Sequence, residues 1–161
     1  MITISITVKK ISVYDEVAKT TAYTGKKAED DGSAYRRIFA TDSDRNMLER
    51  FWREACSFAT SELKRFIVSV NEQPESHGVD LDRDYELTLE VSSAYDENLT
   101  DSIAGSLFSY FVSSIVSKWY KFANKEEAAD YATMAGTMLN DVMQKIFYRK
   151  KPTRVKPGAT T

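Results

Sequence analysis

The stretch "DENLTDSIAGSLFSYFVSSIVSKWYKF", residues 96–122, contains the longest charge-free run of the chain, 16 residues from Ser102 to Ser117 that include six serines. Asp96 or Asn98 can cap a helix that we expect to continue to about Phe122. Apolar residues occupy most of its circumference, which is typical of a helix enclosed by the rest of a protein. The run is too short and too polar to cross a bilayer. We therefore expect a buried helix and no membrane partner.

The serines of this helix recur every three or four residues and form a narrow strip of small side chains, at Ser102, Ser106, Ser109, Ser113 and Ser117. Residues at this spacing share one helix face. Another helix can approach such a strip closely, or the strip can face solvent or a neighbouring subunit. The first four of these serines are candidate subunit contacts.

Two further helices flank this one along the sequence. Asp42 or Ser43 can cap a helix to about Val70, with a broad apolar stripe at Met47, Leu48, Phe51, Trp52, Ala55, Phe58, Ala59, Leu63 and Phe66. Asn124 and Glu127 form a capping-box pattern at the start of the last helix. Its seam, with steps of four and three as in coiled coils, runs through Ala128, Ala132, Ala135, Leu139, Val142 and Ile146.

Residues 2–8 and 85–91 alternate polar and apolar side chains, the period of half-buried strands. An isolated strand leaves its backbone groups unpaired, so the two segments should pair with each other or with a neighbouring subunit. Ile2 and Ile4 are therefore further candidate subunit contacts. The β-branched residues of segment 11–25 favour a strand, whereas Tyr14, Val17, Ala18 and Thr21 have helical spacing. Of the two we expect a short helix ended by Gly25, and then a loop with a turn at Asp31-Gly32.

The predicted fold is α+β and mainly α: a three-helix body, a small sheet built from an N-terminal strand and a mid-chain strand, and an extended C-terminal tail. A chain of 161 residues fits a single domain. We place a globular domain at residues 1–151 and the basic tail at 152–161, because Pro152 and Pro157 prevent further helix.

Charge is distributed unevenly along the chain, whose net value is −2. From Lys145 onward there are six basic residues and no acidic one, whereas the preceding 144 residues carry 16 Lys and Arg against 24 Asp and Glu, a net −8. The candidate partner-binding residues are the tail cations Lys150, Lys151, Arg154 and Lys156. Such cations suit an acidic protein surface, including the body of another copy, or nucleic-acid phosphates. The acidic body favours protein, because it would repel a duplex.

The residues indicate no catalytic, metal or cofactor site, and we expect a protein that is not an enzyme. His77 is the single histidine and lies in a polar loop, and Cys56, the single cysteine, falls on the apolar side of a helix. Asp80, Asp82 and Asp84 match the first half of a calcium loop, but the glycine and glutamate that the motif requires are replaced by Tyr85 and Val91.

Three segments resemble the head-to-tail connector, or adaptor, proteins of tailed bacteriophages and prophages. They are "DSDRNMLERFWREACSFATSELKRFI", which resembles the first helix of that family, the 96–122 segment with its Trp119-Tyr120 end, and the last helix finishing in "IFYRKKP". The resemblance covers about residues 41–152 and lies in the order and spacing of the segments. The segment before Thr41, the long last helix and the tail depart from the family, so subunit contacts there do not transfer.

The resemblance implies a non-enzymatic virion structural protein, assembled in the host cytoplasm, that forms a homo-oligomeric ring between the portal and the tail proteins. The alternative is a small nucleic-acid-binding or packaging accessory protein that acts through the basic tail.

Overall fold

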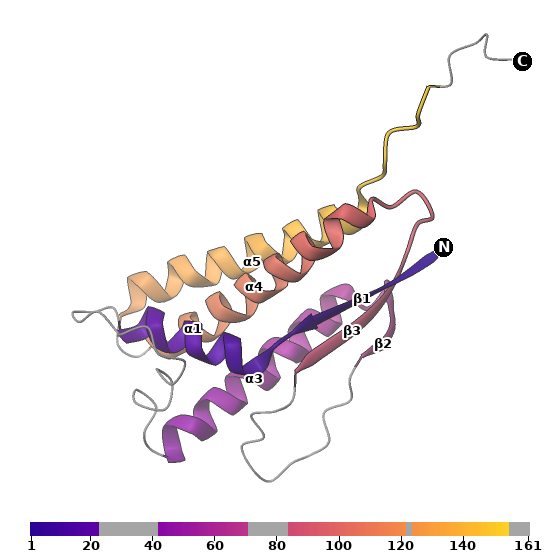
Figure 1. Cartoon of the computed structure of the whole chain (residues 1–161). Coiled ribbons are helices and arrows are strands. Elements are labelled where there is room, and N and C mark those ends of the chain that lie inside the picture. Colours follow the sequence, from indigo (N-terminus) through magenta and orange to yellow (C-terminus); the bar gives the residue numbers. More distant parts are fainter. Residues whose placement is uncertain (23–41, 71–83, 122–123, 155–161) are drawn as a thin grey trace, which may run out of the picture.

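The computed structural model describes residues 1–22, 42–70, 84–121 and 124–154. In order, their elements are β1 (Ile2–Val8), α1 (Lys10–Ala22), α3 (Asp42–Leu63), β2 (Ile67–Val70), β3 (Tyr85–Val91), the 3-10 helix η1 (Glu97–Leu99), α4 (Thr100–Tyr120) and α5 (Lys125–Phe147). Figure 1 shows α4 and α5 side by side along one flank of the molecule, with the sheet and α3 on the other. The predicted α+β, mainly helical fold is confirmed.

The strands form an antiparallel sheet in the order β1-β3-β2. Both predicted strands have the expected bounds and pair with each other, from Ile2 opposite Val91 to Val8 opposite Tyr85. Ile4, Ile6 and Val8 point into the core, whereas the Thr and Ser residues between them are exposed. The alternation of the sequence therefore gives the sheet one apolar face and one polar face.

The helix predicted to reach Val70 is shorter, and this prediction was wrong. α3 ends at Leu63, the Phe66 N–H donates to the Leu63 carbonyl at 2.9 Å, and β2 follows. Leu63, Phe66 and Val70 have helical spacing, which is why the segment resembled a continued helix. Residues 67, 68 and 70 are β-branched and favour a strand, and β2 pairs with β3 through Ile67, Ser69 and Val70.

The short helix expected over residues 11–25 is confirmed as α1, and it buries Tyr14, Val17, Ala18 and Thr21 on one face. Gly25, the turn at Asp31-Gly32, His77 and Asp80 to Asp82 lie outside the described residues. The end expected for α4, Phe122, lies outside them too, and the described helix ends at Tyr120.

The core forms where α4 passes between α1, α3 and α5. Trp52 of α3 stacks on Phe111 of α4 with ring centroids 4.7 Å apart, and Tyr14 of α1 meets Trp52 edge-on at 6.1 Å. All three side chains are buried. Contrary to the expectation from residues 102–117, Glu97–Tyr120 is long and apolar enough to cross a membrane by length and composition, because the helix extends beyond that run at both ends. Half of its most apolar window is buried within the chain.

Two side chains of α3 differ from the predicted stripe. Phe58, expected in the core, is 56% exposed. Glu49, expected on the polar side, is buried and lies 2.6 Å from the ammonium of Lys10, which is itself fully buried. The Tyr14 hydroxyl donates to the same carboxylate at 3.0 Å. A buried ion pair therefore joins the start of α1 to α3.

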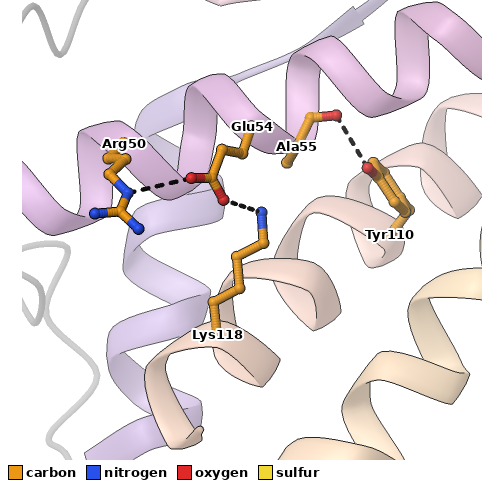
Figure 2. A network of polar contacts seen from close by, with 5 residues as sticks. All are labelled: Arg50, Glu54, Ala55, Tyr110 and Lys118. Atoms are coloured by element: carbon orange, nitrogen blue, oxygen red, sulfur yellow. Dashed lines mark hydrogen bonds and ion pairs between the residues drawn. The ribbon is translucent and has the colours of Figure 1, made fainter.

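Two further polar contacts join α3 to α4, an exposed network around Glu54 and a buried hydrogen bond from Tyr110 (Figure 2). The Glu54 carboxylate accepts hydrogen bonds from Lys118 at 2.7 Å and from Arg50 at 3.1 Å, and the Tyr110 hydroxyl donates to the Ala55 carbonyl at 3.0 Å. The Lys118 hydrogen bond, followed by that from Arg50, lowers the pKa of the Glu54 carboxyl. These contacts fix α3 against α4.

The strip of small side chains on α4 is covered by α5. Ser106 and Ser113 are buried, and the Ser117 hydroxyl donates to the Ala128 carbonyl at 2.9 Å. Of the predicted α5 seam, five residues are buried and Ala132 is exposed. The Asn124 side chain accepts from the Glu127 N–H at 3.4 Å, which confirms the predicted cap.

Candidate protein-binding surface

The chain changes from helix to extended backbone at Tyr148, the residue that caps α5 with φ −66° and ψ 135°. Arg149 then forms an antiparallel bridge with Tyr95, and the Lys150 N–H donates to the Ala94 carbonyl at 2.9 Å. We call residues 149–154 the C-terminal arm; all six are exposed. The body therefore holds the root of the arm through its backbone, and Figure 1 shows the arm projecting away from the helices and the sheet.

Successive side chains at the arm root enter different hollows. Phe147 and Arg149 line a cavity of about 230 Å³, together with Met1, Phe66, Glu90 and Val91 of β3, Ser92 directly after it, and Ile146 of α5. Tyr148 lines a second cavity of about 340 Å³, with Asp96, Leu99, Asp141, Gln144 and Lys145. This alternation follows from the extended backbone, which turns neighbouring side chains to opposite sides.

Large apolar side chains remain exposed around the first cavity. Met1 is 77% exposed and Phe147 is 56% exposed, although Phe147 meets the Phe66 ring edge-on at 5.2 Å. Tyr148, next to Phe147 in the chain, is 51% exposed and lines the other cavity. We call these residues of the two cavities, Met1, Phe66, Phe147 and Tyr148, the aromatic rim. Exposed apolar groups gathered at one place, next to polar residues, are typical of interaction surfaces.

The second cavity contains a polar network that links it to α4. Lys145 forms an ion pair with Asp141, and both bond to Ser106 of α4, the carboxylate accepting at 2.6 Å and the ammonium donating at 2.8 Å. Hydrogen bonds from Lys145 and then from Ser106 hold the pKa of the Asp141 carboxyl below its ordinary value. This triad ties the end of α5 to the start of α4 and so fixes the position of the arm root.

The arm cations that we predicted as partner-binding residues face solvent where the structure describes them. Lys150, Lys151 and Arg154 are exposed, and Lys156 lies outside the described residues. The Lys150 ammonium is 3.9 Å from Asp96, with 54% of its side chain exposed. A pair this open contributes little to stability, so the Lys150 charge remains available to a partner.

The predicted subunit contacts are divided between interior and surface. Ser106 bonds to Asp141 of α5 in its own chain, Ser113 is buried, and Ile4 points into the core, so these three lie within the protomer. Ser102 is exposed, and Ser109 and Ile2 are half-buried. For these three residues a role in subunit contact stays a prediction.

The aromatic rim was missed because Phe147 and Tyr148 were interpreted as the end of a packed helix. The seam of α5 reaches Ile146, so the next residue already points away from α4. Two aromatic residues directly after the last seam position were the available signal. Sequence alone gave no means of placing Met1 and Phe66 beside them.

The described residues contain neither a metal-binding cluster nor an exposed thiol. Within residues 1–22, 42–70, 84–121 and 124–154, no cluster of His, Cys, Asp or Glu side chains is arranged to hold a metal ion. Cys56 is buried, and that burial raises the pKa of its thiol to about 12.

Comparisons with known protein families, with curated proteins and with solved structures found no significant match to this chain.

Proposed function

We propose that this protein is a structural subunit of a tailed-phage or prophage virion, a head-to-tail connector that assembles in a ring between the portal and the tail. Its chemistry is association, without catalysis. The proposal combines the resemblance of the three helical segments with the architecture of the end of the molecule from which the arm leaves.

One observation carries the proposal: an extended cationic arm, held at its root by backbone hydrogen bonds, leaves the body beside an exposed aromatic rim. A fixed root lets the arm project without unfolding the body. The rim provides apolar area of the kind found at interface centres, and the arm provides charge that an acidic partner surface complements. With a body of net −8, the arm of one copy suits the body of another.

The alternative function is direct binding of nucleic acid as a packaging accessory protein. It is favoured by one specific arrangement: the exposed Tyr148 ring precedes three consecutive cations, Arg149, Lys150 and Lys151. Stacking on bases beside phosphate contacts is a known mode of single-strand binding. The acidic body opposes it for duplexes, which makes it the second choice.

Native mass spectrometry of the purified full chain, alone and mixed with a portal protein from the same phage or prophage, tests the proposal. We expect a closed oligomer of one size, or assembly that depends on the portal protein, with rings visible by negative-stain microscopy. A strict monomer that ignores the portal protein and retards single-stranded DNA in a gel would instead establish the alternative.

A further inference from the structure

The two edges of the sheet differ in their readiness to accept another strand. β2 is four residues long, and its register with β3 shifts between Ile67 and Ser69, where Val68 is 61% exposed. β1 pairs with β3 through seven consecutive residues without a shift, and it contains neither Pro nor a charged residue. Short, irregular edges resist pairing, whereas long regular ones template it. Among the described residues, β1 pairs with β3 alone. β1 is therefore the receptive edge.

The outer face beside that edge is acidic and lined with small groups. Thr3, Ser5 and Thr7 of β1 are exposed, and so are Glu86 and Glu90 of β3, the neighbouring strand. Neither strand carries a Lys or Arg between its bounds. Because the β1 side chains are short, a long side chain from a strand added outside β1 could lie across them and approach the glutamates.

The arm has a suitable conformation and charge. Arg149 and Lys150 are bonded to the body of their own chain, so residues 151–154 remain, and four residues of extended chain span about 13 Å, roughly half the length of β1. In an extended chain, alternate residues share a face, so Lys150, Pro152 and Arg154 lie on one side. Pro152 cannot donate a backbone hydrogen bond, which is tolerated in an edge strand when that position faces outward.

We infer that the arm of one copy adds as an extra strand to the free edge of β1 in the next copy, with Lys150 and Arg154 directed towards Glu86 and Glu90. This inference rests on the proposed function and specifies the contact that closes the ring. A strand outside β1 would lie about 10 Å from β3, two strand spacings, a gap that a Lys or Arg from one side and a Glu from the other can bridge. Main-chain hydrogen bonds would supply affinity, and the charges would favour the arm over other strands.

The arm of another copy fits this edge better than the arm of the same chain. Residues 151–154 are exposed, and Figure 1 shows the arm pointing away from its own sheet. Each copy would place its arm on one neighbour and receive the arm of the other neighbour on its own β1. The contact between copies is therefore head-to-tail. Such contacts produce a closed ring when the rotation between copies closes.

Cysteine cross-linking between separately labelled chains tests the contact. Thr3→Cys, Ser5→Cys and Thr7→Cys proteins are each mixed with a Pro152→Cys protein under mild oxidation. The native Cys56 stays silent, because burial raises its thiol pKa to about 12. We expect a mixed disulfide with one or two of the three edge variants, since only a pair with close Cα atoms can bridge. Thr137→Cys, exposed on α5, is the matched control and should not cross-link.

A second experiment compares two substitutions of opposite charge at Ser5. Ser5→Lys places a cation where the arm cations must pass, and Ser5→Glu adds a similar bulk with the attractive sign. We expect Ser5→Lys to reduce the yield of cross-linking at the remaining edge positions roughly fivefold, and Ser5→Glu to leave it unchanged or raised. Equal losses from both variants would indicate a steric effect and overturn the charge assignment.

The outcomes separate this inference from the proposed function. Rings that form and bind the portal protein, with none of the edge variants cross-linking to the arm, would overturn the inference and leave the connector function intact. A Ser5→Cys/Pro152→Cys double variant that closes only within one chain would do the same. Absence of any oligomer and of portal binding would reject both.

Discussion

Lys10 is fully buried, although a lysine next to a strand end is ordinarily expected to face solvent. Its ammonium has no exposed surface, lies 2.6 Å from Glu49, and is within 6 Å of the ring centroids of Tyr14 (5.6 Å) and Trp52 (5.9 Å). Its backbone N–H also donates to the Asp84 carboxylate at 3.0 Å. One residue therefore links α1, α3 and the start of β3.

Replacing Lys10 by Met should destabilise the fold by about 3 kcal/mol, because Glu49 would remain buried after losing a charged partner. Urea unfolding monitored by circular dichroism measures this change. Arg50→Met is the matched control: Arg50 pairs with Glu54 at the surface, with 73% of its side chain exposed, and its loss should cost less than about 1 kcal/mol. Equal losses in the two variants would contradict the assigned importance of the buried pair.

Asp141 gives the fold a dependence on pH. Its folded-state pKa lies below the ordinary 3.8, so the carboxylate form stabilises the fold at neutral pH. That contribution is lost as the pH falls from about 4 through the lower folded-state pKa. Because 39% of the side chain is exposed, we expect about 1 kcal/mol or less.

Asp141→Asn should lower the free energy of unfolding at pH 7 by this amount. At pH 3 the free energies of unfolding of variant and parent should differ by less than at pH 7. Thermal unfolding of both proteins at the two pH values measures it. A difference that stays constant between pH 7 and pH 3 would show that the Asp141 charge is not the cause.

Among the elements, the contact between α4 and α5 depends on small side chains. Ser113 is 3% exposed beneath α5, whereas Ser109 on the same helix is only half-buried. Ser113→Leu should destabilise by about 1–3 kcal/mol through overpacking, and Ser109→Leu by less than about 1 kcal/mol. Denaturant midpoints of the two variants test this order, and a larger loss from the Ser109 variant would contradict it.

Elements with a strict period were predictable from sequence, and those that depend on distant partners were not. Both seven-residue strands and the cap of α5 followed from local patterns. β2 was missed because Leu63, Phe66 and Val70 fit a helix equally well until β3 is available to pair with. The burial of Glu49 depends on Lys10, 39 positions earlier, and no period within α3 reveals it.

The candidate surface was only half predictable for the same reason. The arm cations follow from composition, since they form a run without an acidic residue. The aromatic rim required the three-dimensional meeting of Met1, Phe66 and Phe147, which come from three separate parts of the chain.

For the molecule as a whole, the arm should be dispensable for folding and necessary for assembly. Truncation after Lys151 removes only residues that the structure exposes or does not describe, so the melting temperature should stay within about 2 °C, because losing exposed residues changes stability little. Native mass spectrometry should show the oligomer lost. A retained oligomer together with a salt-sensitive loss of DNA binding would favour the packaging accessory protein.

Salt should weaken the full-length assembly for a related reason. Cations of the arm and carboxylates of the body lie at the surface, where added salt screens their attraction. Light scattering measures the oligomer size between 50 mM and 500 mM salt. We expect the size to fall as salt is added, to about the size that a Lys150→Gln/Arg154→Gln variant has at low salt. An oligomer insensitive to both changes would mean that the aromatic rim alone holds the subunits.

The pairing of β1 with β3 also affects how the chain is made. Ile2 finds its partner at Val91, 89 positions later, so the first strand leaves the ribosome long before the strand that covers one of its edges. At about 5–20 residues per second, this interval lasts several seconds. During synthesis the strand thus has both edges open, and neighbouring nascent chains on one message could pair through it too early. Crowded translation is therefore a condition under which this protein is prone to misassemble.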